Sequence, residues 1–216
     1  MTSFMFSGYK WNIKESNTPM GPRDNYFSKD CISVKPDELK LQIKKINGIV
    51  YCGEVVSEKS FGYGTYYFYL SSRIDLISPD LVLALFTYKD DNNEIDIEFS
   101  KWENPTNQNS QYVLQPSDVV GHLYRFDSKL NGDNTTHIIR WMPGEIQFTS
   151  LHGHYVTPPN SGFIINTWQY KKSDVPVPST EKVRINLWKC NKTHLVAATN
   201  KNIDYATIKK FEFKAL

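Results

Sequence analysis

The 216-residue sequence has no long apolar segment, no excess of charge of one sign and few cysteines. Its longest apolar run, residues 81–86, is far shorter than the roughly 20 residues that a membrane-spanning helix needs. Lys and Arg number 25 against 23 Asp and Glu, so bulk charge does not steer the chain to nucleic acid or to a membrane surface. We therefore expect no nucleic-acid and no membrane partner.

The three cysteines are Cys31, Cys52 and Cys190, and none lies in a CxxC or Cys/His pair with zinc spacing. A Cys31–Cys52 disulfide and three free thiols both remain open. The N-terminus lacks the basic and apolar regions of a signal peptide. We expect a secreted or cell-envelope protein whose signal is not in this sequence, and a cytoplasmic location stays open.

Long segments of helical period are also missing, whereas apolar residues alternate with polar ones almost throughout. Aromatic residues reach 14%, which is typical of β-rich proteins or of proteins that stack on flat ligands. The alternation predicts strands at 39–43, 49–57, 64–71, 81–88, 94–100, 111–115, 122–126, 136–141, 145–150, 163–168, 182–188 and 206–213.

Turn signals such as Asn47-Gly48 and Pro143-Gly144 separate these segments. About twelve short strands spaced by turns indicate an all-β, two-sheet antiparallel sandwich of jelly-roll type. We expect one domain over residues 1–216, with residues 1–38 as an arm packed on the sandwich. The loops at 101–110, 152–162 and 170–181 are long enough to wall a groove.

Three acidic residues share one face of the predicted strand at 94–100. Side chains alternate across a strand, so Glu94, Asp96 and Glu98 lie on one face and the intervening apolar residues on the other. Each acid raises the pKa of its neighbours, so such a row opposes stability. The row is either a functional site or a solvated acidic edge that resists aggregation.

The chemistry of these acids fits the cleavage of glycosidic bonds. A retaining glycosidase uses one ionised carboxylate as nucleophile and one protonated carboxylic acid as acid/base, with the two carboxyl groups about 5–5.5 Å apart. Glu94 and Glu98 could reach this separation on a concave sheet. We expect Asp96 to orient Glu94 and to keep negative charge near Glu98, which would hold Glu98 protonated.

Several motifs resemble those of glycoside hydrolase family 16, the concanavalin A-like jelly-roll glucanases that include lichenases and laminarinases. The pentad E-x-D-x-E is present as 94–98. Further similarities, in family order over residues 38–213, lie in Tyr51-Cys52-Gly53-Glu54, Phe61-Gly62-Tyr63-Gly64-Thr65-Tyr66, Leu85-Phe86-Thr87-Tyr88, the stretch from Phe126-Asp127 to Trp141, and Arg184-Ile185-Asn186-Leu187-Trp188.

The resemblance implies a sandwich of two curved antiparallel sheets and assigns roles to its acids. Glu94 would be the nucleophile, Asp96 its helper and Glu98 the general acid/base. The positions that would line the sugar groove are Glu54, Phe86, Tyr88, Asn186 and Trp188. For Phe86 and Trp188, plain core packing is the alternative.

The sequence also departs from the lichenase pattern. Asn92-Asn93 replaces the Trp-Asp pair before the nucleophile, and Val56 replaces an arginine two residues after the groove glutamate. The family's calcium-ligand aspartate aligns with Ala206, although Asp204 is near. We expect no cofactor and no metal ligands, with a structural calcium left open.

Two further binding candidates come from position alone. Trp102 follows the acidic strand, and its face could stack on a sugar ring or pack as a lid or in the core. Gln111 starts the next predicted strand, where Tyr112 or Gln115 could also touch sugar.

These observations predict a monomeric retaining endo-β-glycanase that hydrolyses a β-1,3/1,4-linked glucan or a related polysaccharide. The alternatives are a non-catalytic, lectin-like carbohydrate-binding module and a transglycosylase on the same scaffold. The presence of all three acids favours the enzyme.

Overall fold

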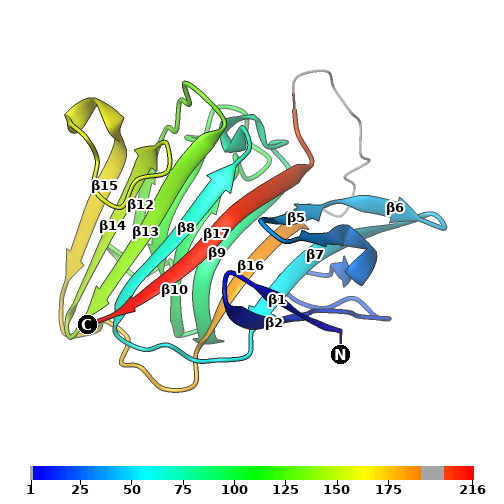
Figure 1. Ribbon diagram of the computed structural model, residues 1–216, viewed down its shortest axis with the longest axis horizontal. Helices are drawn as coiled ribbons and strands as arrows, with labels where there is room; N and C mark the ends of the chain where they lie inside the picture. The colour runs from blue at the N-terminus through cyan, green and yellow to red at the C-terminus, as the bar shows by residue number, and fades with distance from the viewer. Residues whose placement is uncertain (1, 191–201) are drawn as a thin grey trace.

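The computed structural model of the protein describes residues 2–190 and 202–216. Over these residues the chain forms two β-sheets stacked face to face, antiparallel apart from the short parallel pair β3–β7. In Figure 1 the strands of one sheet, among them β8 and β17, lie in front of β9 and β16 of the other. The predicted two-sheet antiparallel sandwich of jelly-roll type is therefore confirmed.

The sheet that carries the acidic strand has ten strands in the described part of the chain. Its order is β1 (Ser3–Phe6), β2 (Tyr9–Ile13), β7 (Ile49–Ser57), β16 (Lys182–Lys189), β9 (Leu81–Asp90), β10 (Asn93–Phe99), β11 (Ser110–Leu114) and β12 (Leu123–Phe126), with β3 (Tyr26–Phe27) and β6 (Lys44–Ile46) paired to β7.

The second sheet has seven strands within the same described ranges. Its order is β15 (Ile164–Lys171), β14 (Glu145–His152), β13 (Asn134–Met142), β8 (Gly64–Ser71), β17 (Tyr205–Ala215), β5 (Glu38–Gln42) and β4 (Ile32–Lys35). Short 3-10 turns lie at η1 (Lys29–Cys31), η2 (Ile74–Leu76) and η3 (Ser161–Phe163).

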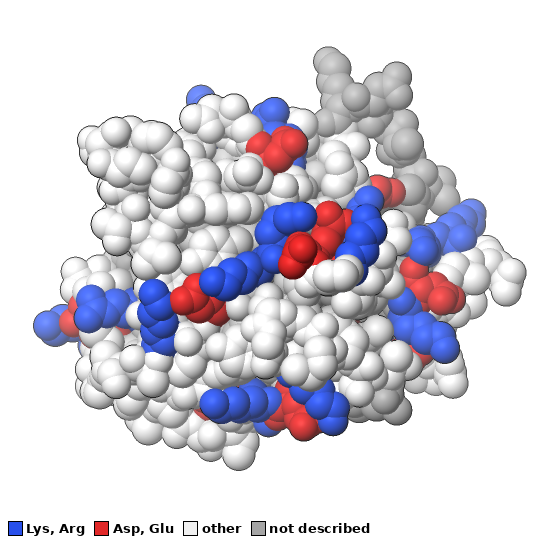
Figure 2. Space-filling model, in the orientation of Figure 1, with Lys and Arg blue, Asp and Glu red and all other residues white. Residues whose placement is uncertain are grey.

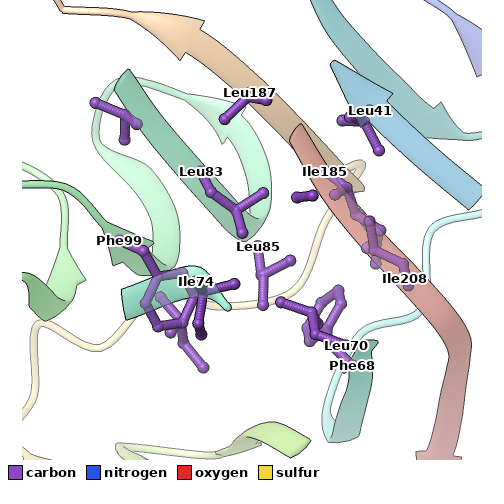
Figure 3. Packing of buried hydrophobic residues seen from close by; sticks show 14 of the residues in the cluster. Leu41, Phe68, Leu70, Ile74, Leu83, Leu85, Phe99, Ile185, Leu187 and Ile208 are labelled. Atoms are coloured by element: carbon purple, nitrogen blue, oxygen red, sulfur yellow. The ribbon is translucent and has the colours of Figure 1, made fainter. Parts of the chain in front are cut away.

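The core fills the space between the sheets because each strand sends every second side chain inward. The apolar run of β9 divides in this way: Leu83 and Leu85 are buried in the core, whereas Ala84 and Phe86 face outward. Figure 3 shows Leu83 and Leu85 packed near Ile185 and the aromatic ring of Phe68 from the opposite sheet. The outward face of β9 is thereby left available for a surface site.

The first 38 residues, expected as an arm packed on the sandwich, supply strands to both sheets. They contribute β1 and β2 to one edge of the ten-stranded sheet and β4 to an edge of the other. Phe6, Trp11 and Ile13 bury their side chains in the common core, which explains why this polar stretch pairs as strands. The N-terminal strands therefore belong to the scaffold of the sheets.

The outer face of β17 carries charges of both signs. Lys210 and Lys214 flank Glu212 at 2.7 and 3.5 Å. Figure 2 shows this row as alternating blue and red side chains across the face in view. Exposed pairs of this kind contribute little stability. In the residues that the structure describes, no helix is long and apolar enough to cross a membrane.

Candidate active site

The acidic strand β10 is built as the alternation predicts. Ile95, Ile97 and Phe99 are buried in the core, and the three acids lie on the opposite face of the sheet. Glu94 and Glu98 line a cleft of about 570 Å³ on that face. A volume of roughly 300–1,000 Å³ is typical of sites that bind small molecules or short oligomers. The acidic row is therefore part of a cleft and not a solvated edge.

All seven residues that we expected to bind substrate line the same cleft. They are Glu54, Phe86, Tyr88, Trp102, Gln111, Asn186 and Trp188. The cleft is also lined by Lys14, Met20, Gly21, Pro22, Ala84, Asp91, Gln115, Ser117 and Arg184. The structure thus brings together residues from the N-terminal segment, five strands and three loops.

Strand register explains why residues distant in sequence meet here. Directly opposed residues of antiparallel strands share a face, and one row across the sheet contains Glu54, Asn186, Ala84, Glu98 and Gln111 in that order. Neighbouring strands lie about 4.8 Å apart, so the row places Glu54 roughly 14 Å from the acid Glu98. The cleft therefore runs across the strands.

Asp96 is buried beneath the cleft and shares a hydrogen bond with Glu94. Two carboxyl groups can share a hydrogen bond only if one keeps its proton. Burial and the charges of Glu94 and Glu98 raise the pKa of Asp96 well above its usual value. Asp96 therefore keeps the shared proton and donates a hydrogen bond to the Glu94 carboxylate.

The Glu94 carboxyl is tuned by its surroundings. Burial raises the pKa of Glu94 to about 7, and the charges of Glu98 and Asp91 act in the same direction. The hydrogen bond from Asp96 and the positive charge of Arg184 lower this pKa. Glu94 thus has two neighbours that favour its ionised form, as a nucleophile requires.

Glu98 is held by a chain of hydrogen bonds from β11 and β12. Gln111 Nε2 donates to Glu98 Oε2 at 2.6 Å, and Arg125 Nε donates to Gln111 Oε1 at 3.0 Å. Burial raises the pKa of Glu98 to about 7, opposed by Gln111 and Arg125. A carboxylic acid with such a pKa can both give and take a proton near neutral pH.

The structure bears on the role expected for Asp96. We expected its negative charge to keep Glu98 protonated; burial is the largest cause of the raised pKa of Glu98, and the pKa of Asp96 is itself raised well above its usual value. The physical reason is that three carboxyl groups in one buried row cannot all ionise. An Asp96 whose pKa is raised in this way suits the role of a neutral donor to Glu94.

Asp96→Asn is therefore expected to leave the alkaline limb of the pH–rate profile almost in place, because asparagine is also neutral and can donate to Glu94. Asp96→Ala removes the donor, so the pKa of Glu94 rises and the acidic limb moves to higher pH. Profiles of kcat/KM for both variants check this. An alkaline limb that moves to lower pH in Asp96→Asn would show that Asp96 is charged in the working protein.

Glu54 is almost fully buried but is well supplied with donors. Arg184 Nη1 lies 2.7 Å from its Oε1, Lys14 Nζ 3.0 Å from its Oε2, and Asn186 Nδ2 3.4 Å from Oε2. Two cations beside one carboxylate offset the cost of burying its charge. Three donors therefore fix the Glu54 side chain at the far end of the row from Glu98.

Trp102 both lines the cleft and packs on its neighbour. Its ring meets Trp188 edge to face, with ring centres 5.8 Å apart. Its indole Nε1 is buried, and no partner for it lies within the described residues. Trp102 is therefore half-buried: one part of its ring packs on Trp188, and another part faces the cleft, where a sugar could stack.

Trp102→Ala is expected to raise KM and to lower kcat/KM with little change in Tm, because the exposed side of the ring contributes binding rather than core packing. Kinetics and thermal unfolding check this. Trp168→Ala is the control: it makes the same truncation on β15 outside the cleft, so KM should stay at the wild-type value. A stability loss of about 3–5 kcal/mol with unchanged kinetics, as for a fully buried Trp, would make Trp102 structural.

Three polar residues of the site had not been expected to act there: Lys14, Arg125 and Arg184. Gln115, expected as a possible contact with sugar, donates from its Nε2 to Asp96 Oδ2 at 3.4 Å. Arg184 lies two residues before Asn186 on one strand, so the period of two could have placed it on the cleft face. Lys14 and Arg125 are recognisable only from strand pairing.

The three cysteines are free and buried thiols, so the Cys31–Cys52 disulfide is absent. No group of three His, Cys, Asp or Glu residues in ranges 2–190 and 202–216 is arranged to hold a metal ion. Near the aligned calcium position, the backbone oxygen of Asp204 accepts from Ile43 N at 3.0 Å.

No protein-family model and no curated protein sequence matches the chain. Solved structures do. The β-glucanase of Bacillus licheniformis matches at a TM-score of 0.68 and 18% identity, over 99% of this chain and 98% of that one. A β-1,3-1,4-glucanase (lichenase) from a mouse hindgut metagenome matches at 0.66 and 18%, over the whole of both chains.

A pseudo β-1,3-glucanase of Mycobacterium tuberculosis, described as an immunostimulatory antigen, matches at a TM-score of 0.61 and 14% identity over 95% of this chain and 91% of that one. A family 16 glycosyl hydrolase of Mycobacterium smegmatis matches at 0.66 and 13%, over 96% and 93%. Identities this low establish the fold and not the activity. The chain has the concanavalin A-like jelly-roll fold of the family 16 glycoside hydrolases, to which its motifs also point.

Proposed function

We propose that the protein is a retaining endo-β-glycanase that hydrolyses a β-1,3/1,4-linked glucan or a related polysaccharide. The observation that carries this proposal is the pair Glu94 and Glu98 in one cleft, each with its pKa raised to about 7 by burial. Two such carboxyl groups are the machinery of a retaining glycosidase. The glucan specificity is proposed because two structural neighbours are a β-glucanase and a β-1,3-1,4-glucanase.

In the first step, Glu98 gives its proton to the glycosidic oxygen while the Glu94 carboxylate attacks the anomeric carbon. The bond to the leaving sugar breaks, and a covalent glycosyl ester forms on Glu94. Asp96 keeps its proton and its hydrogen bond, which orients the attacking carboxylate. Gln111 holds Oε2 of Glu98, so Oε1 remains free to face the leaving oxygen.

In the second step, Glu98 is ionised and takes a proton from a water molecule that attacks the same anomeric carbon. The ester bond to Glu94 breaks, and the product leaves with the configuration of the substrate. The acid of the first step is the base of the second, as microscopic reversibility requires. If a sugar hydroxyl takes the place of water, the same steps give transglycosylation.

A binding module without turnover is the second candidate, and one neighbour is indeed described as a pseudo-glucanase. The buried Oδ1 of Asn186 in the cleft has no partner in the described part of the chain, and it suits either function, because it can accept from a sugar hydroxyl with or without catalysis. The presence of both carboxyl groups favours the enzyme.

The test is a panel of polysaccharides, including β-1,3-glucan, mixed-linkage β-1,3-1,4-glucan and a β-galactan. New reducing ends measure hydrolysis, and NMR of the first products gives their anomeric configuration. We expect turnover of a β-glucan with β-configured first products, and none by Glu94→Gln. Binding without turnover would establish the binding module, and α-configured first products would exclude the retaining mechanism.

A further inference from the structure

Val56 and Arg184 are directly opposed residues on β7 and β16. Cross-strand partners of this kind point to the same face with their Cβ atoms about 4.5–5.5 Å apart. Position 56 is where the resemblance to lichenases leads one to expect an arginine beside the groove glutamate. The guanidinium missing from one strand is thus present on its neighbour, on the same face of the sheet.

Arg184 connects two residues of the cleft. Its Nη1 pairs with Glu54 Oε1 at 2.7 Å, and its guanidinium carbon lies 4.6 Å from the centre of the Tyr88 ring. Both partners line the cleft, as Arg184 itself does. The Arg184 Nε is buried, and it has no hydrogen-bond partner among the residues that the structure describes. An unmade hydrogen bond of this kind is costly unless a ligand completes it.

We infer that Arg184 is a substrate-binding and positioning residue of this cleft: it fixes Glu54 and Tyr88 and recognises, together with Asn186, a hydroxyl-bearing sugar unit next to the cleaved bond. This inference rests on the proposed function. It deepens that function by naming a specificity-determining residue that neither the motifs nor the comparisons assign.

The polar atoms around Arg184 specify the chemical class of the ligand. Within the described ranges, Asn186 Oδ1 is a buried acceptor and Arg184 Nε a buried donor, each without a hydrogen-bond partner. A sugar hydroxyl can donate and accept at once, so it satisfies such a set. Glu54, already bonded to two cations and one amide, has acceptor capacity left for a further hydroxyl. The ligand is therefore a neutral, hydroxyl-rich sugar.

Arg184 also acts on the proposed nucleophile through its charge. The titratable and charged groups that face Glu94 are Asp96 and Glu98 on its own strand, Asp91 in the preceding turn, the directly opposed Tyr88 on β9 and Arg184 on β16. Among these, Arg184 carries the positive charge that favours the ionised form of Glu94. Removal of Arg184 should therefore raise the pKa of Glu94, whereas removal of a merely structural residue would leave this pKa unchanged.

The experiment compares the wild type with Arg184→Met and with the double variant Val56→Arg/Arg184→Met, which returns the guanidinium from the opposite strand. Lys182→Met is the matched control, since Lys182 lies on the same strand, bonds to the Glu58 carbonyl at 2.6 Å and does not line the cleft. The measurements are KM and kcat on the glucan that the panel identifies, and Tm.

Arg184→Met is expected to lower kcat/KM by about tenfold to hundredfold, as the loss of a hydrogen bond from a charged group does. The acidic limb should move to higher pH because the pKa of Glu94 rises. The double variant should recover most of kcat/KM, and Lys182→Met should resemble the wild type. Unchanged kcat/KM and pH profile in Arg184→Met, or no recovery by an equally folded double variant, would overturn the inference.

A second readout separates this inference from the proposed function. The pKa of Glu94, followed by carbon-13 NMR of its carboxyl group without substrate, should rise in Arg184→Met. If the wild type turns over no polysaccharide but binds an oligosaccharide, the dissociation constants of the same variants replace kcat/KM. A wild type that neither cleaves nor binds any member of the panel overturns the proposed function and the sugar-binding role, whereas an unshifted Glu94 in an active Arg184→Met overturns the positioning role alone.

Discussion

Glu94→Ala is expected to reduce turnover of the glucan below about a hundredth of the wild-type rate, because the covalent step loses its nucleophile. Azide should restore turnover by entering the space that the carboxylate leaves and attacking the anomeric carbon itself. Glu98 still protonates the leaving sugar. The product is then an α-glycosyl azide, inverted relative to the β-linked substrate.

Proton NMR of the azide product and initial rates with and without azide check this prediction. Glu58→Ala is the control, since Glu58 is an exposed residue paired with Lys10 outside the cleft. Residual activity above a hundredth, or a glycosyl azide of β configuration, would assign the nucleophile to another carboxylate.

Glu98→Gln is expected to lower turnover of unactivated glucan by about 10²–10⁴-fold, the usual contribution of a general acid/base. The loss in the first step should be much smaller for an aryl β-glycoside whose leaving group needs no proton. The glycosyl ester on Glu94 should then accumulate, because glutamine cannot deprotonate the attacking water.

A burst of released phenol followed by a slow steady phase would show this accumulation, and mass spectrometry of the intact protein would detect the ester. Glu212→Gln, a neutral replacement in the exposed charged row of β17, is the control. Equal losses for glucan and for the aryl glycoside would exclude Glu98 as the acid.

The strands were predictable where the alternation of apolar and polar residues is regular and turn residues flank it. Residues 49–57 and 64–71 form β7 and β8 with the bounds that their alternation predicts, and Asn47-Gly48 marks the turn before β7. The N-terminal strands were not predicted, because β1, β2 and β4 are only four or five residues long and their stability comes from pairing with β7 and β5. Such pairing depends on register, which the sequence of one strand does not contain.

In the candidate site, too, the residues that follow from one strand or motif were predictable, and those that depend on strand pairing were not. The three acids of β10 follow from the period of two within a single strand, and the groove residues follow from motifs. Lys14 and Arg184 reach Glu54 only because β2, β7 and β16 are adjacent in the sheet. The loops at 152–162 and 170–181, expected as walls, contribute no residue to the described cleft, which Pro22, Asp91 and Ser117 line instead.

The three buried cysteines make local unfolding of the protein measurable by thiol labelling. Burial raises the pKa of Cys31 and Cys190 to about 11 and that of Cys52 to about 12, so the folded protein offers almost no reactive thiolate near neutral pH. An alkylating reagent can then reach these residues only when the surrounding strands separate. Since Cys52 lies on β7 beside Glu54, its labelling rate measures how often the floor of the cleft opens, with and without a bound sugar.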